Sequence, residues 1–182
     1  MAGKATGYVV HEGCDHVFFV GFLGAGKSTV ARNLGRLFGR PYVDTDRMAE
    51  RVLHQSVAKV FAQRGESAFR DAETQVLRDL RRRKSLLVSC GGGIVERDEN
   101  LTLMHEMGAV VFLDGLLDDS LRQIQSLEKR PDLARIEDAA ALYERRRPLY
   151  ERAADVSVGI TGKSFEEVAQ ETGRLLWERG LL

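Results

Sequence analysis

The sequence of 182 residues is poor in several residue types, and each shortage excludes a class of protein. Two cysteines, Cys14 and Cys90, are too few for a disulfide framework, so we expect reduced thiols and a cytoplasmic location. The 27 basic residues balance the 27 acidic ones, which removes the overall field that attracts nucleic acid or an acidic membrane surface. No apolar run is long enough to span a bilayer, and the first 15 residues lack the apolar core of a signal peptide.

The remaining composition is that of an ordinary soluble protein, with 43% hydrophobic and 30% charged residues. A chain of this length suits one compact domain with a real core. We therefore expect an N-terminal extension over residues 1–15 and a single domain over 16–182. We also expect a monomer whose partner is a small-molecule substrate.

Short apolar runs rich in β-branched residues alternate with helical patterns along the chain. The expected strands cover residues 16–20, 41–44, 85–90, 109–114 and 155–160. The expected helices cover 30–38, 48–53, 57–61, 69–80 and 164–176, with Gly39 as a C-cap and Ser56 and Ser164 as helix starts. Strands separated by helices indicate parallel pairing through right-handed crossovers, and hence an α/β sandwich. Its active site is expected beyond the carboxyl ends of the strands.

The stretch from Gln123 to Arg147 is the most polar and charge-rich part of the chain, and it contains Pro131. Few strong apolar anchors precede Leu142, so we interpret residues 123–147 as a mobile lid. The arginines near its ends, Arg130 and Arg146, are the type of residue that stabilises a transferring phosphoryl group when a lid closes. A solvated basic face is the alternative for each of them.

The segment GFLGAGKST, residues 21–29, matches the pattern G-x-x-x-x-G-K-[ST] and lies between an expected strand and an expected helix. That context indicates a phosphate-binding loop, because glycines let backbone N–H groups turn inward around phosphate oxygens. Lys27 is expected to reach the β- and γ-phosphates of ATP, and the Ser28 hydroxyl to bind Mg²⁺. The expected nucleotide-binding residues are Gly24, Ala25, Gly26, Lys27, Ser28 and Thr29.

The second expected strand ends in Asp44-Thr45-Asp46. Residues two apart on a strand point the same way, so both carboxylates are expected in one cleft. One can help to hold magnesium through water, and the other can accept the proton of an attacking hydroxyl. The alternative is a pair of solvated carboxylates at the start of the next helix.

Two further features suggest an acceptor site. Arg70 and Glu73 lie three apart on a helix, where Arg70 either offers a planar fork to an anion or forms an exposed ion pair with Glu73. The third expected strand runs through Cys90, interpreted as a packed residue, into Gly91-Gly92-Gly93. Three consecutive glycines are expected where a ligand lies against bare backbone, and a loose turn is the alternative.

Together these motifs resemble those of the shikimate kinase family. The resemblance extends from about Val17 to Trp177 and rests on GFLGAGKST, on DTD at 44–46 and on F-x-x-x-G-E-x-x-F-R-x-x-E at 61–73. It also includes GGG at 91–93, Arg130-Pro131 and R-x-P-L-Y at 146–150. It implies a P-loop fold like that of nucleoside-monophosphate kinases, a three-layer sandwich with a five-stranded parallel sheet of order 2-3-1-4-5.

The resemblance also implies roles for individual residues in the transfer of the ATP γ-phosphoryl group to the 3-hydroxyl of shikimate, a step in aromatic amino-acid biosynthesis. Asp46 would bind the shikimate hydroxyls and act as the base, while Asp44 would support Mg²⁺. Arg70 and Arg146 would grip the shikimate carboxylate. The backbone at Gly92 would lie against shikimate, and Arg130 would close over the phosphates.

Two other functions are compatible with these motifs. Another small-molecule kinase of the same fold, acting on gluconate or a nucleotide, would need the two arginines to meet a different anion. A nucleotide-binding regulatory protein without catalysis is the second alternative. It is disfavoured by the simultaneous presence of Lys27, Asp46, Arg70 and Arg146.

Overall fold

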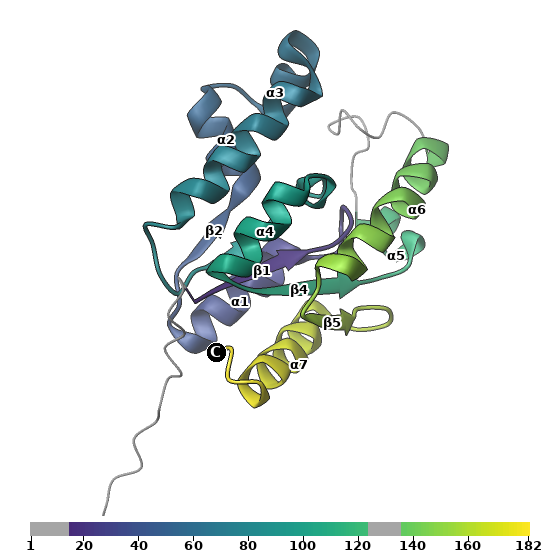
Figure 1. Cartoon of the computed structure of the whole chain (residues 1–182). Coiled ribbons are helices and arrows are strands. Elements are labelled where there is room, and N and C mark those ends of the chain that lie inside the picture. The colour runs from purple at the N-terminus through teal and green to yellow at the C-terminus, as the bar shows by residue number, and fades with distance from the viewer. Residues whose placement is uncertain (1–14, 124–135) are drawn as a thin grey trace, which may run out of the picture.

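The computed structural model describes residues 15–123 and 136–182. Its centre is a sheet of five parallel strands in the order β2-β3-β1-β4-β5 (Figure 1). The strands are β1 (His16–Val20), β2 (Tyr42–Asp44), β3 (Leu87–Ser89), β4 (Gly108–Asp114) and β5 (Val156–Gly159). The expected strands, their parallel pairing and the order 2-3-1-4-5 are all confirmed.

Alternate side chains of the central strand β1 enter two separate hydrophobic cores, one on each face of the sheet. Phe18 and Val20 face the core beneath α4 (Asp98–Met107), α6 (Ile136–Ala153) and the second half of α3 (Val57–Leu80). Val17 and Phe19 face the core beneath α1 (Lys27–Phe38) and α7 (Phe165–Glu178). Because period-two alternation sends neighbouring residues to opposite faces, one strand supports both helix layers. The expected three-layer sandwich is therefore confirmed.

A smaller hydrophobic cluster joins α2 (Thr45–Leu53) to α3 beyond the β2 edge of the sheet (Figure 1). The sequence predicts two helices where the structure has α3. Gly65, with φ 79° and ψ 169°, breaks the helical geometry there, so α3 consists of two helical segments joined at a kink. Glycine suits this position because side-chain-bearing residues rarely adopt so positive a φ. Both predicted helices exist.

The predicted helix ends are confirmed by their capping groups. Gly39 ends α1 in the left-handed conformation at φ 65°. The Ser56 side chain accepts a hydrogen bond from the Lys59 amide at the start of α3. Ser164 and Glu167 form a reciprocal capping box at the start of α7. Each cap satisfies backbone groups that the first or last turn of a helix leaves unpaired.

The predicted lid extends too far toward the C-terminus. Residues 136–147 belong to α6, whose side chains Ala139, Leu142 and Tyr143 are buried against the main core. Three apolar contacts within two turns anchor a helix, although the surrounding residues are polar. Arg130 and the rest of the segment 124–135 lie outside the described residues, as does the expected extension up to residue 14.

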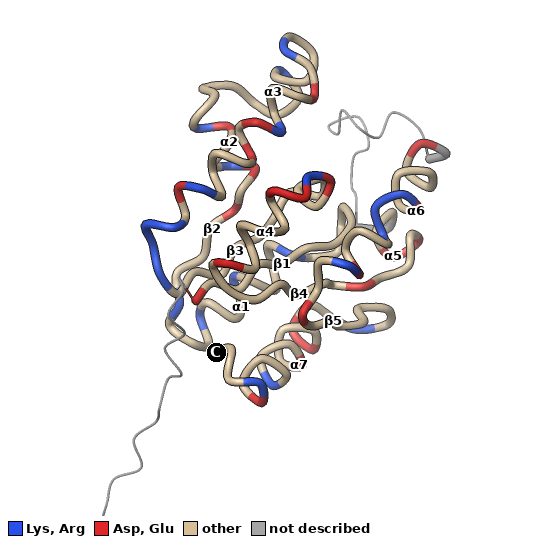
Figure 2. The backbone as a smooth tube through the Cα atoms, in the orientation of Figure 1, with Lys and Arg blue, Asp and Glu red and all other residues tan. Residues whose placement is uncertain are grey.

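Basic and acidic residues are interspersed along the described chain, with one short basic stretch between α3 and β3 (Figure 2). Within residues 15–123 and 136–182, no helix combines the length and the apolar character needed to cross a membrane. Since all five strands are parallel, the segments that follow β1, β2, β3 and β4 emerge at the same edge of the sheet. The phosphate-loop sequence, Asp44 and the glycine triplet all lie at this edge.

Candidate active site

The segment from Gly21 to Gly26 connects β1 to the first residue of α1, as the sequence predicts. Gly24 and Gly26 have φ values of 77° and 80°, a conformation that favours glycine. A Cβ atom on Gly24 would lie 2.5 Å from the Ser120 carbonyl oxygen, so this loop also needs glycine for close packing. The Lys27 ammonium donates to the carbonyl oxygens of Gly21 and Phe22, both at 2.8 Å, which holds it over the loop.

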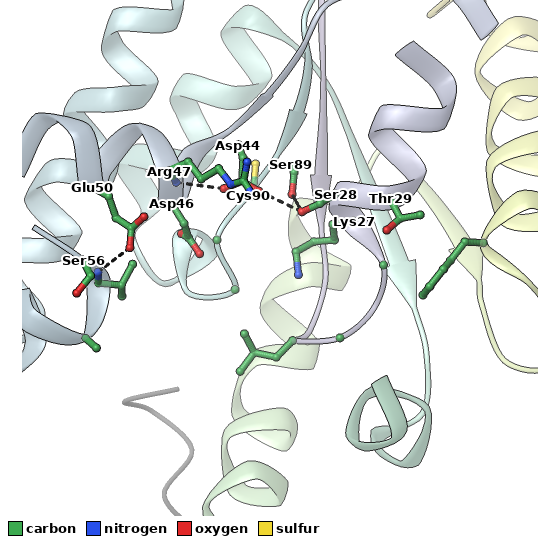
Figure 3. Close-up of a pocket in the computed structure, with 18 residues that line it drawn as sticks. Lys27, Ser28, Thr29, Asp44, Asp46, Arg47, Glu50, Ser56, Ser89 and Cys90 are labelled. Carbon is green, nitrogen blue, oxygen red and sulfur yellow. Dashed lines mark hydrogen bonds between the residues drawn. The ribbon is translucent and has the colours of Figure 1, made fainter. Parts of the chain in front are cut away.

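A cavity of about 540 Å³ opens beside this loop. Figure 3 shows the Lys27 ammonium and the Asp46 carboxylate pointing into it, from α1 on one side and from α2 on the other. Its lining contains eight of the predicted site residues: Gly24, Gly26, Lys27, Ser28, Thr29, Asp44, Asp46 and Gly92. Ala25 is buried instead and does not line the cavity. The cavity thus joins a cationic, amide-rich wall to an acidic one.

Ser28 and Asp44, the predicted magnesium ligands, are within hydrogen-bond distance of one another. The Ser28 hydroxyl donates to Asp44 Oδ2 at 3.1 Å, and its oxygen lies 3.0 Å from the Ser89 hydroxyl (Figure 3). The other oxygen of Asp44 caps α2 by accepting from the Arg47 amide at 3.2 Å. Mg²⁺ prefers hard oxygen ligands such as hydroxyl and carboxylate groups. It usually takes only a few ligands from the protein, and water and phosphate oxygens complete its coordination. These residues fit Mg²⁺, and the described chain forms no larger His, Cys, Asp or Glu cluster for a metal.

Asp46 reaches the cavity by a different route from the predicted one. The strand β2 ends at Asp44, and Asp46 lies in the first turn of α2, so the argument from strand alternation is wrong. Asp44 ends the strand because its side chain caps the helix that follows. The buried Thr45 hydroxyl accepts from the Gly91 amide at 2.9 Å, which ties the start of α2 to the glycine triplet. Both carboxylates still line one cavity, as predicted.

Side chains of the protein itself lie close to each glycine of the triplet. A Cβ atom on Gly91 would lie 2.2 Å from Asp46 Oδ1, and one on Gly93 would lie 2.2 Å from Arg70 Nη2. A Cβ on Gly92 would have more room, since its nearest neighbour is Arg146 Nη1 at 3.4 Å. The triplet therefore lets three predicted site residues converge on one turn. The approach of a ligand to Gly92 stays a prediction.

Arg70 is not the exposed ion pair that the sequence allowed as an alternative. It is 6% exposed and donates from Nη1 to Glu73 Oε2 at 2.6 Å, and from Nη2 to Glu66 Oε1 at 2.7 Å. The rings of Phe61 and Phe69 lie 6.0 and 5.7 Å from its guanidinium carbon. This packing fixes the guanidinium against Gly93.

Glu73 is completely buried beside Asp46 and Arg70. Burial raises the pKa of the Glu73 carboxyl to about 7, with a further contribution from the Asp46 charge, although Arg70 opposes the shift. Its Oε1 atom accepts no hydrogen bond from the residues that the structure describes, and a Cβ atom on Gly91 would lie 2.7 Å from it. Glu73 is thus an acidic group that titrates near neutral pH directly behind the glycine triplet.

Arg146 lies in α6 and is 1% exposed. Its Nε donates to Glu96 Oε1 at 3.0 Å, while its Nη1 is the atom nearest to a Cβ built on Gly92. The neighbouring Tyr150 hydroxyl donates to the Gly92 carbonyl oxygen at 2.6 Å, which fastens α6 to the triplet. The structure therefore brings Arg70 and Arg146 to adjacent residues of the same turn. The predicted role of Arg130 stays untested, because it lies outside the described residues.

Sequence reasoning missed several residues that shape the site. Phe165, at the start of α7, lines the cavity and would contact any side chain placed on Gly26, and Glu50 lines the acidic wall. Ser89 and Glu96 contact predicted site residues. Nothing near Ser89 or Glu96 in the sequence points to these contacts, since their partners are 61 and 50 residues away. Cys90 is buried, as predicted, and burial raises the pKa of its thiol well above the ordinary value.

Comparison with known proteins assigns this arrangement to a family. The family model described as shikimate kinase matches residues 23–176. The shikimate kinase of Dehalococcoides mccartyi is 35% identical over 159 residues, covering 86% of this chain and 90% of that protein. The shikimate kinase of Burkholderia thailandensis is 39% identical over 142 residues, covering 76% and 77%.

A solved structure agrees with these matches. Shikimate kinase from Acinetobacter baumannii in complex with shikimate superimposes with a TM-score of 0.86 at 30% identity, covering 90% of this chain and 93% of that one. The residues matched by the family model include Gly24 to Thr29, the glycine triplet and Arg146. The chain belongs to the shikimate kinase family, a family of phosphotransferases.

Proposed function

We propose that this protein transfers the γ-phosphoryl group of ATP to the 3-hydroxyl of shikimate, giving shikimate 3-phosphate and ADP. The observation that carries the proposal is a single cavity with Lys27 on one wall and Asp46 on the other. Two buried arginines meet beside it at the glycine triplet. Family membership and the shikimate complex of the relative from A. baumannii support the same acceptor.

On the donor side, the loop from Gly24 to Thr29 would bind the ATP phosphates. Its backbone amides and the N-terminus of α1 favour anions, and Lys27 adds a full positive charge. Ser28 and Asp44 would hold Mg²⁺, which when bound would neutralise charge on the phosphate oxygens. Arg130 would close over the same phosphates. Positioning and electrostatic stabilisation, rather than covalent chemistry, would supply most of the rate.

On the acceptor side, Arg70 and Arg146 would grip the carboxylate of shikimate, and Gly92 would present bare backbone to its ring. Asp46 would accept the proton of the 3-hydroxyl as that oxygen bonds to the γ-phosphorus. The bond from the γ-phosphorus to the bridging oxygen breaks at the same time, and ADP leaves with the electron pair. Glu73 lies behind Asp46. Its ionised carboxylate would make the electrostatic potential at Asp46 more negative, which favours proton uptake by Asp46.

The experiment is an assay that couples ADP release to NADH oxidation, run with Mg²⁺ and ATP in the presence and absence of shikimate. We expect ADP release that depends on shikimate, and a product that phosphorus NMR identifies as a phosphate monoester. Gluconate and a panel of nucleoside monophosphates serve as competing acceptors. A higher kcat/KM for any of these than for shikimate would overturn the proposal. Size-exclusion chromatography of the same sample tests the expected monomer.

A further inference from the structure

A third carboxylate lies between the two arginines. Glu96 ends the short 3-10 turn η1 (Ile94–Glu96), which directly follows the glycine triplet. Its Oε1 accepts from Arg146 Nε at 3.0 Å and from Arg145 Nη2 at 2.8 Å. Its Oε2 lies 3.4 Å from Arg70 Nη2. Glu96 therefore bridges α3 and α6, two helices that are separated in the sequence by β3, α4 and β4.

The electrostatics explain why such a bridge matters. Arg70 and Arg146 are both almost fully buried and both approach the same glycine turn, so their like charges repel in a region with little water. Glu66 and Glu73 contact Arg70, whereas Glu96 contacts both arginines. Although burial works against the charge of Glu96, Arg146 and Arg70 lower the pKa of its carboxyl below the ordinary value. Glu96 is thus a charged counter-ion shared by the pair.

The geometry also separates the bridge from the cavity. Glu96 uses the Nε atom of Arg146, and the Nη1 atom lies against Gly92. Gly92 lines the cavity, whereas Arg70, Arg146 and Glu96 lie behind it and are not among the described residues that form the lining. Arg146 can therefore direct Nη1 toward Gly92, on the cavity side, while Glu96 holds its Nε from the other side.

We propose that Glu96 is a positioning residue that holds Arg70 and Arg146 at the spacing required by the carboxylate of the substrate. The proposal rests on the proposed function for the identity of the substrate. Selectivity for an acidic acceptor would then come from two guanidinium groups that are held in place before the substrate binds. Pre-organisation of this kind strengthens binding by removing the cost of ordering the side chains on binding.

The first test compares Glu96→Gln, Glu96→Asp and Glu99→Gln with the unaltered protein. We expect Glu96→Gln to raise the KM for shikimate about tenfold, the effect of losing one contact to a charged group. The KM for ATP should change by less than about twofold, and kcat should change little, because the donor side is untouched. Glu96→Asp keeps the charge but shortens the reach, so its KM should lie between the two. Glu99→Gln is the matched control, because Glu99 pairs with Arg78 at an exposed position on α4.

The sign of the effect decides between two roles. If Glu96 only competed with the substrate for the arginines, Glu96→Gln would lower the KM for shikimate, and that result would overturn the proposal. An unchanged KM, or equal changes in the two KM values, would overturn it as well. Melting temperatures of all variants, measured in parallel, show whether a raised KM reflects a loss of folding.

A second test needs no substrate. NMR relaxation of the arginine Nε–Hε groups in the ligand-free protein should show an ordered Arg146 signal that becomes mobile in Glu96→Gln but not in Glu99→Gln. If the protein fails to phosphorylate shikimate while this signal responds, the proposed function falls and the positioning role stands. If Arg146 stays equally ordered in Glu96→Gln, the positioning role falls whatever the substrate is.

Discussion

The two walls of the cavity are built in different ways. The phosphate wall comes mainly from one short segment, Leu23 to Thr29 apart from the buried Ala25, and relies on backbone amides and one lysine. The acceptor wall draws Asp46 from α2 and Gly91 and Gly92 from the end of β3, and it is backed by Arg70 from α3 and Arg146 from α6. Its side chains hold one another through buried ion pairs. A contiguous motif is fixed by local geometry, whereas a convergent one depends on the packing of the whole domain.

This comparison predicts that the two walls fail separately. Substitutions on the acceptor wall should impair the use of shikimate and spare nucleotide binding. A substitution there that weakened ATP binding equally would show that the two walls form one cooperative unit.

Asp46→Asn should lower kcat by about 10²- to 10⁴-fold, because the amide cannot accept the proton of the attacking hydroxyl. The nucleotide affinity, measured by calorimetry, should stay close to that of the unaltered protein. Asp71→Asn is the control, since Asp71 is an exposed residue that pairs with Arg97 on the outside of α3. Near-normal turnover of Asp46→Asn would remove Asp46 from the role of base.

Arg146→Ala should raise the KM for shikimate about 100-fold, because a buried charged partner of the substrate carboxylate is lost. The KM for ATP should change far less. Arg147→Ala is the matched control, because Arg147 is the next residue in α6 but is partly exposed and pairs with Asp114 and Glu151. Equal rises in the two KM values for Arg146→Ala would move Arg146 to the phosphate wall.

Gly93→Ala should raise the KM for shikimate about tenfold, because the new Cβ atom would occupy the place of the Arg70 guanidinium. The backbone of Gly93, at φ −96° and ψ 4°, accepts alanine without strain, so the effect reports the displaced arginine. Gly92→Ala is the comparison, since its Cβ would have its nearest contact at 3.4 Å. Steady-state kinetics on both variants measures the difference, and a larger effect at Gly92 would point to the ligand instead of Arg70.

Glu73→Gln should change how stability depends on pH. With a native pKa of about 7, above the ordinary value of 4.5, native Glu73 binds its proton more tightly than the unfolded chain does. The resulting contribution to the free energy of unfolding is present below pH 4.5 and is lost as the pH rises through 7. Glu73→Gln removes this loss, so its stability relative to the unaltered protein should rise by up to about 3 kcal/mol between pH 4.5 and pH 8. Urea unfolding across this range measures the difference, and parallel stability curves would contradict the raised pKa.

Prediction from the sequence succeeded for the contiguous phosphate wall and was less complete for the acceptor wall. The strand order was implied by the family resemblance, and the position of the phosphate loop followed from glycine and lysine spacing between a strand and a helix. The lid boundary was wrong because Ala139, Leu142 and Tyr143 hold α6 in place by packing against the core, and this packing is not visible in the local sequence. Strand alternation was the wrong reason for placing Asp46 beside Asp44, because Asp44 caps a helix that begins at Thr45, so Asp46 is already helical.

The five parallel strands and the phosphate loop follow from the amino-acid sequence alone, because side-chain periodicity, capping residues and glycine conformations act over a few residues. The sequence also indicated which acidic and basic residues were candidates for the acceptor wall. The burial of Glu73 with Arg70 behind Asp46, and the link from Arg70 to Arg146 through Glu96, are visible only in the folded protein. Those contacts depend on burial and on distances between elements far apart in the chain, and these exist only once the sheet and its helices have packed.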